Sequence, residues 1–396
     1  MSLTNTHIAA CIVFVGSFCQ IPLGLAEESD QMQQDSLSKT QTETQFSEEK
    51  ASSYRNDKKE RNYQKRSYSQ SRCNPCCPSD LAYYLCGNKG YFFMEGGPVV
   101  WTASESGLDY AIENKGNTGF ISNGSAKSPD WEWDVGGKLG IGWQSKCRRM
   151  DVFLNWTYFR TTQKSSVTAP DDGAVYPLWT VPISGLTHAS SGNAKWKLWV
   201  NLVDLEGGGK FTPRPWLMIR PSIGVRNALV YQKYNINMFG ASSIGPVVPV
   251  EIDETKMDND FWGVGPKFGL QTLWGSMKGV SFFGNAAFSI LYGRFDVTQK
   301  EVVTFEGVSP PSNFLNYKHK FTLASSIFDL FLGLRYDRMF AGKRGHMAIL
   351  AGWETIFFFG QNQFRVFSSE ANPGVSTPLD HDLTTQGASF LVNFGF

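Results

Sequence analysis

The sequence predicts an all-β fold: a transmembrane antiparallel β-barrel of about 10 to 12 strands with short periplasmic turns and long extracellular loops. Three observations lead to this prediction. Polar and apolar residues alternate with a period of two along most of the chain, the alternating segments are long, and the connections between them are alternately short and long.

The N-terminus has the features of an export signal. An apolar run over 8–18 is followed by small residues at Gly24 and Ala26, which predicts a signal peptide over residues 1–26. Residues 27–72 are polar and of low complexity, acidic at first and then basic. Such a segment buries too little apolar surface to fold alone, so we expect a disordered periplasmic segment, with a periplasmic tether or short coiled coil as the alternative. A Cys-rich connector over residues 73–90 follows, and the barrel is predicted over 91–396.

The stretch "WEWDVGGKLGIGW", residues 131–143, illustrates the alternation. Trp131, Trp133 and Trp143 share an apolar face, whereas acidic and basic residues occupy the other face. In a soluble protein the tryptophans would pack on a core, and in a membrane barrel they would face lipid. One strand cannot decide between these two environments.

Ten segments are predicted as strands on the same grounds. They are longer than the ~5 to 6 residues of a typical globular strand and reach the ~9 to 11 residues that a tilted strand needs to cross a bilayer. The predicted strands are 91–101, 131–143, 151–160, 194–206, 217–234, 261–274, 280–294, 318–337, 346–359 and 383–396.

The connections between these segments alternate strictly in length. Outer-membrane barrels have this asymmetry, with an even number of strands, whereas a soluble sandwich gives no reason for every second loop to be long. A further hairpin within residues 175–184 would widen the barrel. The long connections are 102–130, 161–193, 235–260, 295–317 and 360–382, and the short ones are 144–150, 207–216, 275–279 and 338–345.

Composition agrees with a membrane barrel. Charged residues make up only 18% of the chain, below the ~25% usual for soluble domains, while aromatic residues reach 14% and glycines number 39. The formal net charge of +1 argues against a nucleic-acid partner. No uncharged apolar run after Ala26 is as long as the ~18 residues of a membrane-spanning helix, so membrane integration would require a barrel. We therefore expect the lipid bilayer of the outer membrane of a Gram-negative bacterium as the surroundings, and no metal or cofactor.

The alternation assigns a set of charged residues to the lumen. Both signs would face each other across a narrow pore and filter ions, with at most a mild preference for anions. The alternative is a salt-bridged plug, because barrels of about eight strands are filled by side chains. The predicted pore-lining residues are Glu132, Asp134, Lys138, Lys195, Lys197, Arg220, Arg226, Lys267, Asp329, Arg335, Asp337 and Glu354.

The chain closes on an alternating strand, "SFLVNFGF", that ends in Phe396. A terminal phenylalanine on such a strand is similar to the signal that the outer-membrane assembly machinery recognises. We therefore expect Phe396 to act as an assembly signal and that machinery to be a partner.

From about Gly90 onward the chain resembles the Legionella-type major outer membrane protein family, which has members in Chlamydia-related bacteria. The resemblance implies an outer-membrane barrel that conducts ions and small hydrophilic solutes, and it leaves the segment from Glu27 to Cys86 uncovered. The stretches that carry it, together with the closing strand, are "SESGLDYAIEN" (104–114), "WDVGGKLGIGW" (133–143), "MIRPSIGVR" (218–226), "DFWGVGPKFGLQTLW" (260–274) and "GWE" (352–354).

Five cysteines remain after the predicted signal peptide: Cys73, Cys76, Cys77, Cys86 and Cys147. In an oxidising compartment clustered cysteines form disulfides more often than metal sites. An odd number leaves at least one thiol free or paired with another chain, so disulfide-linked homo- or hetero-oligomers are one hypothesis, as in chlamydial cysteine-rich envelope proteins. Bridges within the chain are an equally weighted alternative, and a zinc site or a CxxC redox pair is a minor one.

Two functions from different classes follow. The first is a porin that allows passive diffusion of ions and small solutes. The second is a structural or surface-interaction protein with a closed barrel, cross-linked through its cysteines. An enzyme is not expected, because no serine or aspartate spacing around His188, His319, His346 or His381 identifies a catalytic triad.

Overall fold

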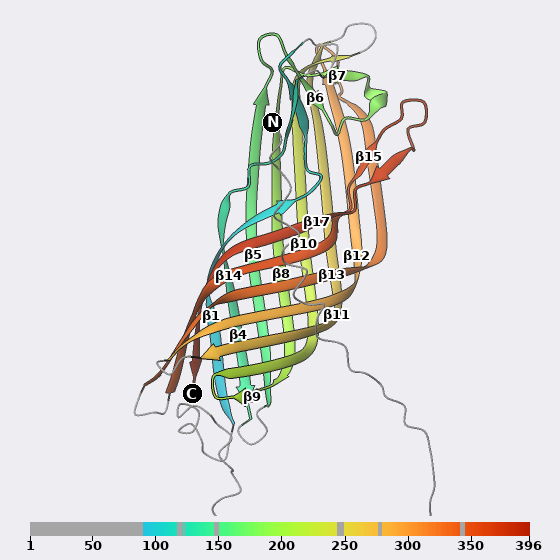
Figure 1. Cartoon of the computed structure of the whole chain (residues 1–396). Helices are drawn as coiled ribbons and strands as arrows, with labels where there is room; N and C mark the ends of the chain where they lie inside the picture. Colours follow the sequence, from blue (N-terminus) through green and yellow to red (C-terminus); the bar gives the residue numbers. More distant parts are fainter. Residues whose placement is uncertain are drawn as a thin grey trace, which may run out of the picture. The chain divides into compact units, whose positions relative to one another are not determined.

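Ten long antiparallel strands form a closed barrel, which confirms the predicted fold class (Figure 1). The structure is a computed structural model and describes residues 90–116, 121, 123–145, 150–243, 249–275, 279–340 and 345–396. The barrel strands are β1 (Tyr91–Glu105), β4 (Trp133–Gln144), β5 (Met150–Thr168), β8 (Ser191–Gly209), β10 (Leu217–Ser243), β11 (Val250–Gly275), β12 (Val280–Phe305), β13 (Ser312–Phe340), β14 (Gly345–Asn362) and β17 (His381–Gly395).

Neighbouring strands in the barrel are neighbours along the chain, except where the first and last strands meet. β1 pairs with β17, so that Phe93 lies opposite Gly395, and pairing of β10 with both β8 and β11 completes the ring. This arrangement leaves no open sheet edge at the level where all ten strands pair, as a lipid environment requires. The described residues contain no helix long and apolar enough to cross a bilayer.

Short elements occupy the connections. The predicted extra hairpin over 175–184 is wrong, because this segment adds no strand to the barrel: β6 pairs with β2 instead, and a short 3-10 helix, η1, follows it. The short elements are β2 (Ala111–Asn114), β3 (Gly124–Lys127), β6 (Ala174–Pro177), η1 (Pro182–Ser184), β7 (Leu186–His188), β9 (Phe211–Arg214), β15 (Arg365–Phe367) and β16 (Ser376–Pro378).

In Figure 1, β1 begins and β17 ends in the lower half of the barrel. The outer surface of this half is apolar. Aromatic side chains mark its two boundaries: Trp133 and Trp353 pack edge to face at 5.8 Å near the upper one, and Trp143 and Trp274 are exposed near the lower one. Between them the exposed apolar side chains include Phe92, Val135, Leu139, Ile141, Leu154, Leu205, Ile223, Val225, Phe268, Leu270, Phe282, Ile290, Leu332, Leu334, Ile349 and Phe390.

In the upper half the two faces of the strands are reversed: apolar side chains lie on the inner face and charged side chains on the outer face. On β8, Trp196 and Leu198 are completely buried, and the lysines that alternate with them, Lys195 and Lys197, lie on the outer face. The predicted placement of both lysines in the lumen is therefore wrong. Further down β8 the order reverses, since Val203 is exposed and Asp204 is buried.

The same correction applies at the start of β4. Trp131 packs edge to face against the buried Trp196 at 5.7 Å, and Glu132, also predicted for the lumen, is exposed just before the strand begins. Trp131 was expected to face lipid. The cause is the surrounding solvent: above the membrane a strand has water outside, so its apolar face turns inward as in a soluble protein.

Six strands continue above the membrane after the others have ended. Pairing of β4 with β5 stops at Tyr158 and pairing of β13 with β14 stops at Ile327, whereas β12 and β13 remain paired up to Val303 and Ser312. The inner face of β5, β8, β10, β11, β12 and β13 carries one apolar cluster, to which the long connections contribute Leu108, Trp179 and Phe364. The long connections thus fill the upper half of the barrel.

We expect lysine acylation to distinguish the two halves. In the folded protein in detergent micelles, a water-soluble amine reagent should modify Lys197 and Lys233 on the outer surface well before Lys138 and Lys267, because the side chains of the latter two are only 12% and 8% exposed. Peptide mass spectrometry measures the four rates, and urea-unfolded protein provides the control in which they converge. Fast modification of Lys267 in the folded protein would contradict the described interior.

Candidate functional site

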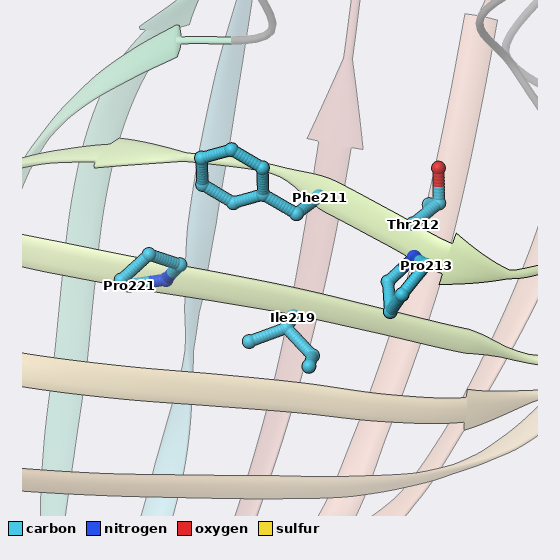
Figure 2. Close-up of a pocket in the computed structure, with 5 residues that line it drawn as sticks. All are labelled: Phe211, Thr212, Pro213, Ile219 and Pro221. Carbon is cyan, nitrogen blue, oxygen red and sulfur yellow. The ribbon is translucent and has the colours of Figure 1, made fainter. Parts of the chain in front are cut away.

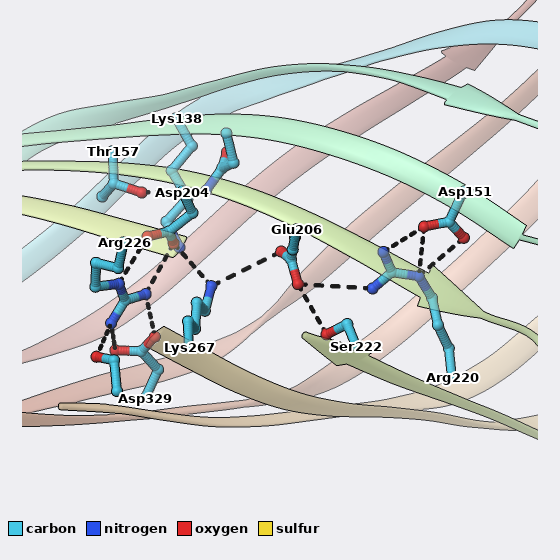
Figure 3. Close-up of polar contacts among 12 residues, drawn as sticks. Lys138, Asp151, Thr157, Asp204, Glu206, Arg220, Ser222, Arg226, Lys267 and Asp329 are labelled. Carbon is cyan, nitrogen blue, oxygen red and sulfur yellow. Dashed lines mark hydrogen bonds and ion pairs between the residues drawn. The ribbon is translucent and has the colours of Figure 1, made fainter. Parts of the chain in front are cut away.

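A chain of ion pairs crosses the lumen in the membrane-spanning half (Figure 3). At its centre Arg226 on β10 holds Asp204 through two hydrogen bonds of 2.7 and 2.8 Å. It also donates to Asp329 on β13, with 3.0 Å between Nη1 and Oδ1. Because β11 and β12 lie between β10 and β13 in the sheet, this second contact spans the interior.

Towards the lower end the signs continue to alternate. Lys267 Nζ lies 2.7 Å from Asp204 and 3.7 Å from Glu206, and Arg220 lies 3.8 Å from Glu206. Arg220 Nε in turn donates to Asp151 at 2.9 and 3.0 Å. Figure 3 shows these side chains converging from β5, β8, β10, β11 and β13.

A second ion pair bridges the opposite wall. Lys138 on β4 pairs with Glu354 on β14, across the two strands that separate them, and lies 5.4 Å from the centre of the Trp101 ring. Ser389 donates to Glu354 at 2.8 Å and accepts from Trp101 Nε1 at 3.1 Å. The carboxylate and the ammonium are both satisfied within the wall.

The lower mouth is more open. Arg335 donates to Asp337 at 2.9 to 3.0 Å, and His346 Nε2 lies 2.8 Å from the same carboxylate. The side chains of Arg335 and Asp337 are 17% and 19% exposed, against 3% for Arg226. Solvent therefore reaches the lower charges, and the interior tightens towards Arg226.

One wall of the lower lumen is apolar. Phe283 and Phe331 pack edge to face at 5.1 Å, and small and branched residues of β14 and β17 complete a separate buried cluster. Apolar residues facing into the membrane-level lumen were not predicted, because β12 and β13 carry apolar residues on both faces.

The upper half of the lumen is filled by three connections that pack on each other. Trp179 packs edge to face on Tyr234 at 6.3 Å and on Phe364 at 6.0 Å. Its indole nitrogen donates to the carbonyl of Asp109 at 2.7 Å, and the Tyr234 hydroxyl donates to the carbonyl of Leu108 at 2.5 Å. We call the segments 106–110, 178–184 and 360–366 the plug.

Buried carboxyl groups hold the plug from the strands. Glu301 on β12 accepts from the backbone N–H of Val181 at 2.8 Å, and Asp253 on β11 accepts from the Thr180 hydroxyl at 2.7 Å. Burial raises the pKa of both carboxyls, and the nearby charge of Asp253 raises the pKa of Glu301 further. Burial also raises the pKa of Glu105 to about 8, although it accepts from Gln232 at 2.9 Å.

The structure places nine of the twelve predicted lumen residues on the inner face of the barrel and joins most of them in ion pairs. Their part in lining a conducting pore stays a prediction. Asp134 belongs to this group and accepts from the Thr161 hydroxyl at 2.5 Å. The nine are Asp134, Lys138, Arg220, Arg226, Lys267, Asp329, Arg335, Asp337 and Glu354.

The predicted set missed the acidic partners Asp151, Asp204 and Glu206. Two of them could have been found, because Asp204 and Glu206 are spaced by two within a strand whose neighbours Val203 and Leu205 are apolar. With these acids included and the outer lysines removed, the expected preference for anions loses its basis. Residues 1–89 and Cys147 lie outside the described residues, and with them the signal peptide, the polar segment and all five candidate disulfide cysteines.

A shallow apolar hollow lies at the lower rim, between β9 and the start of β10 (Figure 2). Phe211, Pro213, Ile219 and Pro221 line it together with Thr212, and the Phe211 side chain is exposed. Its apolar lining fits contact with lipid chains at the lower edge of the membrane.

Comparison with known proteins decides the family. Residues 92–396 match the family described as the Legionella pneumophila major outer membrane protein precursor. The chain belongs to this family. The resemblance expected from the sequence is thereby confirmed, and the protein is a barrel of the outer membrane. None of the curated proteins matches the chain.

The solved structures that match the chain are distant from it. The outer membrane protease OmpT from Escherichia coli is 8% identical, with a TM-score of 0.36, over 77% of this chain and 96% of OmpT. A major outer membrane protein from Thermus thermophilus is 10% identical, with a TM-score of 0.27, over 78% of this chain and 99% of that one. A Pseudomonas aeruginosa FadL homologue is 7% identical, with a TM-score of 0.27, over 81% of this chain and 92% of that one.

Removal of the central guanidinium should destabilise this family member strongly. Arg226→Met removes the cationic partner of Asp329, whereas Asp204 keeps Lys267, so a buried carboxylate is left uncompensated and we expect a loss of about 3–5 kcal/mol in the free energy of unfolding. Urea titration of the protein refolded into vesicles measures it. Arg294→Met, which truncates an exposed arginine on β12, is the matched control and should have little effect. An equal loss in both variants would contradict the role of the network.

The plug carboxyls should make the upper half less stable at high pH. Glu105, Asp253 and Glu301 have raised pKa values, so the folded protein keeps protons that the unfolded chain releases above about pH 4.5. The free energy of unfolding therefore falls as pH rises from there towards 8, by about 1.4 kcal/mol per pH unit for each proton retained.

Urea midpoints at pH 5 and pH 8 test this expectation. Glu105→Gln and Glu301→Gln should each flatten the pH dependence, because an amide does not titrate, while Glu251→Gln alters an exposed carboxyl and should leave it unchanged. A slope that is the same in all three variants would exclude these carboxyls as its source.

Proposed function

We propose that this protein is a closed outer-membrane barrel, a structural and surface-exposed component of the membrane, and that it does not act as an open general-diffusion pore. The observation that carries the proposal is that the interior is occupied at two successive levels. Ion pairs around Arg226 cross the membrane-spanning half, and the apolar plug around Trp179 fills the half above it.

Ten strands enclose a narrow lumen, since eight strands are filled by side chains and 16 to 18 are needed for a wide aqueous channel. A hydrated path would require the separation of Arg226 from Asp204 and Asp329, which are all less than a tenth exposed. Breaking such a buried pair costs several kcal/mol. Displacement of the plug would further expose Trp179 and Phe364 to water.

A gated porin is the second candidate, and the gradient of exposure along the lumen favours it. Charges at the lower mouth, Asp337 and Arg335, are partly accessible, so a hydrated vestibule leads up to the Arg226 layer. Passage of ions or small solutes would then require the plug to move. Filtering by the mixed charges of the lower lumen would remain as expected from the sequence.

A non-enzymatic role fits the arrangement of the histidine that contacts a carboxylate. His346 shares Asp337 with Arg335 at the lower mouth, where the three groups form an ion-pair cluster. Such a cluster supports the lower rim of the barrel and does not require a nucleophile.

Contacts with other proteins are part of the same proposal. Phe396 is 64% exposed at the end of the closing strand, and its N–H donates to the carbonyl of Phe92 at 3.0 Å, so its ring is available to the assembly machinery. Cross-links through Cys73, Cys76, Cys77, Cys86 and Cys147 would join the barrel to neighbouring envelope proteins.

Planar bilayers distinguish the closed barrel from an open porin. We expect the purified, folded full-length protein to give no regular conductance steps at neutral pH, because the Arg226 layer and the plug both block the lumen. Heat-modifiable migration on gels verifies that the inserted protein is folded. Frequent uniform steps from such protein would overturn the closed-barrel proposal.

The double variant Trp179→Ala with Phe364→Ala tests the gated porin. Truncation of both rings loosens the plug, so steps that appear only in this variant would support gating by the plug. Leu323→Ala with Val308→Ala, which truncates two exposed side chains in the upper half, is the matched control and should behave as the wild type.

A further inference from the structure

A cluster of basic side chains lies on the outer surface of three adjacent strands, immediately above the membrane. Lys164 on β5, Lys195 and Lys197 on β8, and Lys233 on β10 all project outward, since the residues that alternate with them are buried. We call these four lysines the basic patch.

The register brings like charges face to face within this patch. Lys197 is directly opposite Lys233, and Lys195 is directly opposite Lys164. Directly opposed like charges destabilise a sheet. Lys233 has an acidic partner, Asp258, at 3.1 Å, but the other three lysines have no ion pair within 4.0 Å in the part of the chain that the structure describes.

Acidic residues border the patch on both sides, and on β11 Asp258 and Asp260 lie opposite Lys233 and Tyr231. Asp130 donates its backbone N–H to the Lys164 carbonyl at 3.2 Å, and Glu132 is exposed beside the same strand. The outer face of β11, β12 and β13 also has two opposed lysines, Lys256 and Lys300. It differs because acids lie among its lysines: Lys256 pairs with Glu254 at 2.7 Å, and Lys320 pairs with Asp296. The excess of positive charge is therefore local to β5, β8 and β10.

The height of the patch is defined by the residues beneath it. A row formed by Arg160 and the two aromatic residues Trp199 and Tyr231 crosses the same three strands, and we call it the aromatic row. Lys197 and Lys233 lie two residues above this row, and Lys164 and Lys195 lie four residues above it. At about 3.3 Å per residue the patch lies roughly 7 to 13 Å above the aromatic row, which is the depth of the lipid headgroups.

Apolar side chains continue below the aromatic row on the same strands. Leu154, Leu205 and Val225 are opposite one another and exposed. A ligand that matches the whole surface has acyl chains, lying on this apolar row, and a phosphorylated headgroup at the level of the lysines.

We propose that the basic patch binds the phosphate groups of an anionic lipid in the outer leaflet of the outer membrane. The lysines neutralise the phosphates, and the phosphates remove the repulsion between the opposed lysines. The site lies on the outer wall, so it does not depend on whether the lumen is open or closed.

Native mass spectrometry of the full-length protein in detergent micelles tests the proposal with bisphosphorylated lipid A as the probe. The wild type should retain this lipid more strongly than the same lipid without phosphates. Lys164→Gln, Lys195→Gln and Lys197→Gln combined should raise the dissociation constant roughly a hundredfold, from about fivefold for each lysine near an anionic surface.

The matched control combines Lys256→Gln, Lys300→Gln and Lys320→Gln, which removes the same amount of charge from β11, β12 and β13. It should bind like the wild type. Heat-modifiable migration must show that both triple variants are folded, and without lipid the patch variant should be at least as stable as the wild type because the opposed lysines are gone.

Three results would overturn the proposal. The first is an equal rise of the dissociation constant in both triple variants. The second is equal binding of the lipid with and without its phosphates. The third is displacement of the bound lipid by inorganic phosphate, when the concentration of inorganic phosphate equals the concentration of phosphate groups on the lipid. The last would identify a site for the free anion, to which the apolar row contributes nothing. A silent planar bilayer, or a conducting one, bears only on the lumen.

Discussion

The structure depends on the change of solvent along each long strand. The lower part of β8 is surrounded by lipid, so Val203 and Leu205 face outward and Asp204 and Glu206 face inward. The upper part is surrounded by water, and there Trp196 and Leu198 face inward. The period of two is the same in both parts, and the surroundings decide which of the two faces is apolar.

This constraint accounts for the two kinds of interior. In the membrane half the outer face takes the apolar residues, so polar and charged groups turn into a lumen that ten strands keep narrow. Charges in such a space need partners, which is why Arg226 is shared by Asp204 and Asp329. In the upper half the inner face is apolar, and the long connections supply the matching surface in Trp179 and Phe364.

The residues that fill the lumen and the basic patch on the outer wall are therefore two results of one arrangement. The transition from apolar to charged side chains occurs at the same level on β5, β8 and β10, where the register aligns Arg160 with the aromatic residues Trp199 and Tyr231. That level separates the ion-pair layer inside the membrane from the plug above it. It also brings the basic patch to the depth of the lipid headgroups.

The family, a barrel of 10 to 12 strands and the long connections within 102–130, 161–193 and 360–382 could be predicted from the sequence. The predicted long connections 235–260 and 295–317 are wrong, because strands occupy most of them: β10 runs to Ser243 and β11 begins at Val250, and β12 runs to Phe305 and β13 begins at Ser312. Their charged residues alternate with buried ones as strands do above the membrane, which the expectation of short membrane-spanning strands did not allow for. The inner placement of Lys138, Arg226 and Lys267 followed from the same alternation. The placement of Lys195 and Lys197 could not be predicted, since alternation defines two faces without saying where the membrane ends. The ion-pair partners and the plug could not be predicted either, because Arg226 contacts Asp329, and Trp179 contacts Phe364, only after the barrel has closed. Local spacing determined the strands, and the tertiary structure decided what each face of a strand contacts, because contacts between distant residues depend on the position of the whole barrel in its two solvents.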